Sequence, residues 1–198
     1  MDRKEPFSPE ESLKLIQLMI DRTRRTISVN SRYFLLWGWA TFAIMIAQYF
    51  LDAVYHSPYA GHVWLIMFPL LFVTGWWLAR DRAERKAKSY VGGAMWEVWT
   101  AIALAYVSGA AIFYKLHWEN IFPVFMVLHS IGIYLSGRIL QFRPFVWGSL
   151  ISFALATIAI WLPYDKQNLL AALAILINYI IPGHIFRKQY NEGRYATE

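Results

Sequence analysis

The pattern of apolar and polar positions divides the chain into six long stretches that carry no charge or, in one case, a single charge. A helix needs roughly 17–25 mostly apolar residues to cross a hydrocarbon core about 30 Å thick. Backbone groups in lipid have no water to bond with, so each stretch must be helical. The predicted spans are 33–51, 63–79, 90–114, 120–137, 144–164 and 167–186.

This pattern predicts an all-α fold, a polytopic membrane helical bundle of six transmembrane helices in three hairpins. The predicted parts are a cytoplasmic N-terminal segment (1–31), the transmembrane domain (32–187) and a cytoplasmic tail (188–198). Composition agrees, because 58% of the residues are hydrophobic and only 16% are charged. Soluble domains run nearer to ~45–50% apolar and ~25% charged residues.

The positive charges predict the orientation of the bundle. All but two of the 19 lysines and arginines fall on one side of the predicted spans. They are Arg3, Lys4, Lys14, Arg22, Arg24, Arg25, Arg32, Arg80, Arg82, Arg85, Lys86, Lys88, Arg138, Arg143, Arg187, Lys188 and Arg194. The opposite connections contain only Lys115 and Lys166. Because basic loops stay inside, we expect a cytoplasmic (inner) membrane protein with both termini in the cytoplasm. A net charge of +6 then requires no nucleic acid partner.

An amphipathic helix is predicted over 9–28, ahead of the first span. Ser8 can cap it, Pro9 suits the first helical position, and Glu11 stands at the capping-box position. One face is apolar and carries Leu13, Leu15, Ile16, Met19, Ile20, Thr23 and Ile27. The favoured interpretation is that this helix lies on anionic lipid at the cytoplasmic face. The alternatives are a homo-oligomer or a cytoplasmic partner bound through residues 8–30.

Glu97 is the one acidic residue inside a predicted span, and a charge there is costly enough to call for a partner. Arg80, Arg138 and His184 are expected at a similar depth on other spans, which predicts a charge cluster at the inner face. The favoured hypothesis is a structural ion pair between Glu97 and Arg138 or Arg80. The cluster could instead hold a lipid headgroup, or Glu97 could exchange a proton with His184.

A second group of polar residues is predicted near the middle of the membrane. His129 and Asn178 lie midway through the fourth and sixth spans, Tyr106 and Tyr134 lie near that level, and Gln48 lies nearer the outer face. Together they could line a polar cavity for a transported or sensed ligand. The simpler alternative is that they make hydrogen bonds between helices.

The absence of certain residue types and motifs from the sequence excludes several classes of function. The sequence contains no cysteine, so disulfides, thiolate metal sites and cysteine nucleophiles are excluded. No nucleotide-binding loop, serine nucleophile elbow or metal-ligand spacing is found, so neither a metal nor another cofactor is predicted. The sequence favours a non-catalytic, small-molecule- or lipid-binding regulatory membrane protein. The alternative is a small transporter or channel with a polar path past Glu97, His129 and Asn178.

Overall fold

The computed structural model of the chain describes residues 10, 13, 35–84, 90–116 and 118–195, and its regular elements are all helical. The predicted helix over 9–28 lies almost wholly outside these residues. In chain order the elements are the helix Leu35–Val54 ending in the π-helical turn η1 (Phe50–Val54), the 3-10 helix η2 (Ala60–Ile66), α2 (Met67–Glu84), α3 (Tyr90–Leu116), α4 (Ile121–Ile139), α5 (Arg143–Ala159), α6 (Tyr164–Ile175), the π-helical turn η3 (Leu176–Ile180) and α7 (Ile181–Tyr195).

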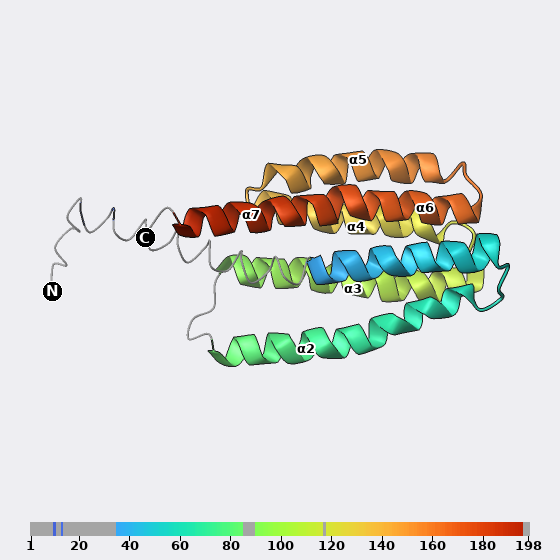
Figure 1. Ribbon diagram of the computed structural model, residues 1–198, viewed down its shortest axis with the longest axis horizontal. Coiled ribbons are helices and arrows are strands. Elements are labelled where there is room, and N and C mark those ends of the chain that lie inside the picture. The colour runs from blue at the N-terminus through green and yellow to red at the C-terminus, as the bar shows by residue number, and fades with distance from the viewer. Residues whose placement is uncertain (1–9, 11–12, 14–34, 85–89, 117, 196–198) are drawn as a thin grey trace.

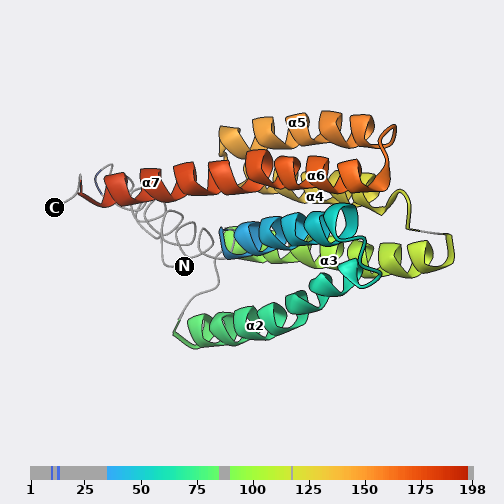
Figure 2. The ribbon, with the colours of Figure 1, turned by 45° about the vertical axis from the view of Figure 1, so that its right-hand side comes forward.

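The helices run along one common axis (Figures 1 and 2). η2 continues directly into α2, and α6 continues through η3 into α7; apart from these continuations, each helix points in the opposite direction to the one before it. The connections after Val54, Leu116 and Ala159 lie at one end of the molecule. Glu84, the turn between α4 and α5, and the end of α7 lie at the other end, which we call the arginine end because Arg80, Arg138, Arg143 and Arg187 lie there. This alternation is the one that a polytopic membrane protein needs.

Within the described ranges, five helices are long and apolar enough to cross a membrane. They are Leu35–Val54, Ala60–Trp77, Gly92–Lys115, Ile121–Ile139 and Tyr164–Lys188. Five of the six predicted spans thus correspond to helices of sufficient length and apolarity, whereas α5 has only 17 residues instead of the 21 expected over 144–164. The helix ends early because Pro163 disfavours helical geometry at Leu162 and cannot itself donate a backbone hydrogen bond.

The core lies between the C-terminal helices. α4 packs against α3 and α5, and α5 also packs on α6 and η3. Half of the α4 span is buried inside the bundle. Only 6% is buried in each of the spans Ala60–Trp77 and Gly92–Lys115, which include α2 and α3 residues. Ile133, Phe145 and Ala171 are fully buried at the centre. α2 lies at the edge of the bundle in both views (Figures 1 and 2). The bundle therefore consists of a packed C-terminal half and a half that exposes apolar side chains, as lipid contact requires.

Gly148 permits the closest approach of α5 to η3, and replacing it should destabilise the bundle. In Gly148→Ala the new Cβ atom would lie 2.8 Å from the Asn178 Cα atom and 2.9 Å from the Ile177 carbonyl oxygen. Overpacking of this kind typically costs about 1–3 kcal/mol. Thermal unfolding of the detergent-solubilised protein, followed by circular dichroism, measures the loss.

Gly75→Ala in α2 is the matched control, because nothing lies within 4 Å of a Cβ atom at that position. Alanine favours a helix over glycine by about 0.5–1 kcal/mol, so the control should melt at an equal or higher temperature. Equal melting temperatures for the two variants would contradict the close approach at Gly148.

Candidate functional site

His129 lies at the middle of α4 and faces α3. Its Nδ1 atom is 3.1 Å from the Tyr106 hydroxyl oxygen, a hydrogen-bonding distance. α3 and α4 are antiparallel neighbours, so the middle of one helix meets the middle of the other. The two residues predicted to share a depth are thus joined directly.

Aromatic rings surround the imidazole of His129. The Trp99 ring lies 5.7 Å from it and the Tyr179 ring 5.1 Å, both in edge-to-face arrangements. Trp99 and Tyr179 also contact each other at 6.2 Å. Gly132, one turn along α4, lies against Ile102 and the indole, since a Cβ atom there would be 3.3 Å from Ile102 Cγ1 and 3.5 Å from Trp99 Cη2. We call His129, Tyr106, Trp99 and Tyr179 the His129 cluster.

The second ring nitrogen of His129, Nε2, is buried and has no hydrogen-bond partner. If the Tyr106 hydroxyl donates to Nδ1, Nε2 carries the proton and is an unused donor; in the other tautomer Nε2 is an unused acceptor. A buried polar group without a partner costs about 1–3 kcal/mol. The Nε2 atom can therefore donate or accept one hydrogen bond, depending on the tautomer, with a molecule that reaches the cluster.

Asn178 lies within η3, where Pro182 distorts the helix. Proline has no amide hydrogen, and its ring crowds the carbonyl four residues earlier, which is that of Asn178. The helix widens there, and the Ile181 amide bonds to the Leu176 carbonyl oxygen. Such π-helical turns often accompany functional sites.

The side-chain amide of Asn178 is buried, and neither of its polar atoms has a partner. The residue packs against Gly148 on α5, and Ser152, one turn further along α5, also has a buried hydroxyl without a partner. Asn178 therefore faces α5, whereas His129 faces α3 and Tyr179. His129 and Asn178, which were expected to line one cavity, therefore contact different helices.

Gln48 and Tyr134 do not join the His129 cluster. Gln48 is buried and ties three helices together near the other end of the bundle: Trp64 Nε1 donates to its Oε1 at 2.6 Å, and its Nε2 donates to the Tyr164 hydroxyl at 3.1 Å. This is the interhelical hydrogen bonding given as the simpler alternative. Tyr134 is half-buried and makes no hydrogen bond to any residue that the structure describes.

The expected ion pair of Glu97 is not formed. Glu97 is exposed and makes no salt bridge within the described part of the chain. The reason is helical register, because Met95, Trp99, Ile102 and Tyr106 follow a spacing of three to four residues and form the face of α3 that meets the bundle. Two residues from Trp99, Glu97 falls on the opposite face.

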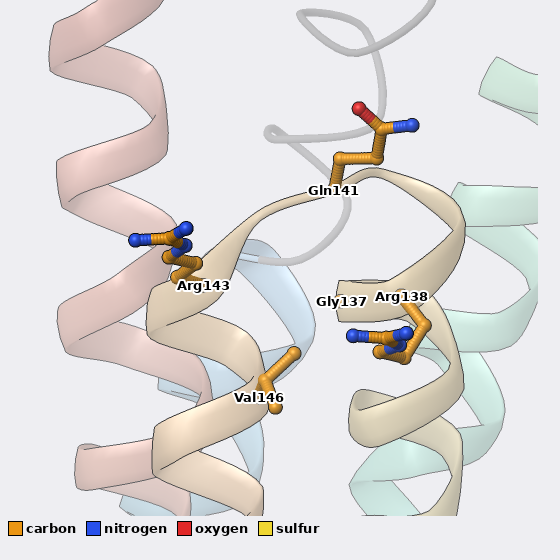
Figure 3. A pocket seen from close by; sticks show the side chains of 5 residues that line it. All are labelled: Gly137, Arg138, Gln141, Arg143 and Val146. Atoms are coloured by element: carbon orange, nitrogen blue, oxygen red, sulfur yellow. The ribbon is translucent and has the colours of Figure 1, made fainter.

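The other members of the predicted inner-face cluster are also exposed. The Nε2 atom of His184 accepts a hydrogen bond from Trp39 Nε1 at 3.2 Å, and Arg80 lies near the end of α2. Arg138 instead lines a pocket of about 350 Å³ together with Gly137, Gln141, Arg143 and Val146, which we call the arginine pocket (Figure 3).

Two features of these sites were not predicted. Trp99 was not among the predicted site residues, and Arg143 was predicted only as one of the basic residues at the inner face, although both line candidate sites. A spacing of seven residues places Trp99 on the same face of α3 as Tyr106, which is a usable signal. Among the described residues no three His, Asp or Glu side chains are grouped so that they could hold one metal ion.

The contacts of Gln48 predict a measurable coupling energy. Gln48→Leu removes the partners of both Trp64 and Tyr164 and should lower the free energy of unfolding by about 1–2 kcal/mol. Trp64→Phe removes one of the same bonds, so the double variant should lose less than the sum of the two single losses. Strictly additive losses in a double-mutant cycle would contradict a bond between Gln48 and Trp64.

Comparison with known proteins does not add to this chemistry. The chain matches no protein-family model, no curated protein and no solved structure. Function is therefore argued from the side chains themselves.

Proposed function

We propose that the chain is a six-span inner-membrane protein without catalytic activity that binds a small molecule or lipid group beside His129. Both termini face the cytoplasm in this proposal. Anionic lipid contacts the cytoplasmic face, and residues 8–30 are available to bind a cytoplasmic partner or a second copy of the chain.

The sixth span of the proposal is α5. Its 17 residues rise about 25 Å at 1.5 Å per residue, which is near the lower limit for crossing a hydrocarbon core. Its apolar side chains Leu150, Ile151 and Ile158 are exposed, as in a helix that faces lipid. Its packing against α4 and α6 supports a full crossing, because those two helices are of spanning length.

The observation that carries the binding proposal is the unused Nε2 atom of His129. It is buried in the low-dielectric interior of the bundle, where an unpartnered polar atom is expensive. An apolar residue of similar size would avoid that cost, so the presence of an imidazole at this position favours a partner from outside the chain. Trp99, Tyr106 and Tyr179 hold the ring in place, which preorganises the atom for one ligand.

The chemistry of the His129 cluster limits the kind of ligand. One hydrogen-bonding atom surrounded by aromatic rings suits an uncharged, mostly apolar molecule with a single polar group, such as a hydroxyl or carbonyl group. The transport alternative has less support, because Glu97 faces away from the bundle and so leaves the proposed polar path without its inner member.

The crossing of α5 can be tested with single cysteines, since the sequence has none of its own. Gln141 and Trp161 are exposed in the connections before and after α5. In intact cells a membrane-impermeant maleimide should label Trp161→Cys but not Gln141→Cys until the membrane is opened. Labelling of both positions from the same side would contradict the six-span topology.

The ligand proposal can be tested by native mass spectrometry of the protein extracted in mild detergent. The wild type should retain one small molecule, and His129→Phe, which keeps the ring but removes both nitrogens, should reduce its occupancy about tenfold, equivalent to one hydrogen bond. His184→Phe is the control, because His184 is an exposed histidine outside the His129 cluster. An empty wild-type chain, or full occupancy in His129→Phe, would refute the proposal.

A further inference from the structure

Backbone amides in the turn between α4 and α5 donate hydrogen bonds to carbonyl groups at the end of α4. The Leu140 amide donates to the Ser136 carbonyl at 2.9 Å, and the Phe142 amide donates to the Gly137 carbonyl at 2.8 Å. Gln141 adopts the left-handed conformation, with φ of 53°, and its amide reaches the Arg138 carbonyl at 3.3 Å. Since the last carbonyls of α4 are bonded by backbone amides, the basic side chains nearby are not needed to cap this helix.

Gly137 brings the two helices together at the arginine end. A Cβ atom at this position would lie 2.9 Å from the Phe145 Cβ atom and 3.0 Å from the Val146 backbone nitrogen. The first turn of α5 therefore lies directly against the last turn of α4. As a result Arg138, from one helix, and Arg143, from the other, line the same pocket.

Among the described residues, two arginines and no carboxylate line the arginine pocket. Arg138 and Arg143 are exposed, and neither forms a salt bridge with a residue in the described ranges. In Figure 3 Arg138 points from α4 into the space between the helices, whereas Arg143 extends from the first turn of α5 toward α7 and Gln141 points outward from the turn; all three line the pocket. Like charges on one pocket repel each other, and a bound anion would relieve that repulsion.

We propose that the arginine pocket binds the phosphate group of one anionic phospholipid. Guanidinium groups match phosphate oxygens with paired hydrogen bonds, and the Gln141 amide can donate another. The volume of about 350 Å³ lies in the range of small-molecule sites, about 300–1,000 Å³. This site is separate from the His129 cluster, and the proposal rests on the membrane topology and the contact with anionic lipid given in the proposed function.

A lipid, rather than free phosphate, fits the surroundings of the pocket. Below it, toward the middle of the bundle, α4 exposes Leu135, and α5 exposes Trp147 and Leu150. Acyl chains of a lipid whose headgroup sits in the pocket can lie against these side chains. Trp147 is 66% exposed directly after the pocket residue Val146, a position that suits the headgroup region of a membrane.

The test compares two lipids that differ in headgroup charge. Phosphatidylglycerol and phosphatidylcholine with the same acyl chains are titrated separately into the full-length protein in mild detergent, and native mass spectrometry measures the 1:1 complex. Two basic side chains near a lipid surface should favour the anionic lipid by roughly 10–30-fold in affinity. The double variant Arg138→Gln/Arg143→Gln should bind the two lipids equally.

The matched control is Arg80→Gln/Arg82→Gln, which removes the same charge from α2 at the same end of the bundle. This variant should keep the preference of the wild type for phosphatidylglycerol. Equal loss in both double variants would show general attraction to a basic surface and would overturn the proposal. Unchanged preference in Arg138→Gln/Arg143→Gln would overturn it as well.

Two further measurements complete the test. Gln141→Glu changes only an exposed turn residue and adds a negative charge at the rim, so it should weaken phosphatidylglycerol binding even if the arginine variant fails to fold. Inorganic phosphate is the second probe. If it binds the wild type as tightly as phosphatidylglycerol does, the pocket serves a soluble anion and the lipid proposal fails.

Discussion

The close packing of α5 against its neighbours is the contact on which the rest of the structure depends. Two glycines make it possible, Gly137 where α4 meets the start of α5 and Gly148 where η3 meets its middle. Lipid provides little hydrophobic driving force between helices, so the helices associate through close contact of small residues. A short α5 fits this arrangement, since it is covered by α4 on one side and by α6 and η3 on another.

Both candidate sites follow from this packing. At the arginine end, Gly137 brings two arginines from different helices to one pocket. In the centre, α4 holds His129 against Tyr106 of α3 and Tyr179 of η3. The two arginines at one end suit an anion, and the single unused ring nitrogen of His129 in the centre suits a neutral polar group.

Most of the fold could be predicted from the sequence, because lipid imposes both helical structure and a minimum length on each span. The same reasoning placed His129 and Tyr106 at one depth, and the structure joins them. The prediction was wrong where the contacts of a side chain depend on the rotation of its helix about the helix axis. Glu97 was expected to face other helices, but the register of Trp99 and Tyr106 turns it outward. Depth can be counted along a sequence, whereas the facing of a single polar residue depends on which neighbours pack against that helix.

The uneven burial of the bundle has a consequence for its biogenesis. A ribosome makes the chain from the N-terminus at about 5–20 residues per second, so α2 and α3 enter the membrane before α5 and α6 exist. Their spans are only 6% buried even in the finished bundle, and they are therefore as well solvated by lipid alone as they are after assembly. The helices that must pack tightly are made last, when every partner is already in place. The order of synthesis thus places α5, with Gly148, in the chain before Asn178, which packs against that glycine.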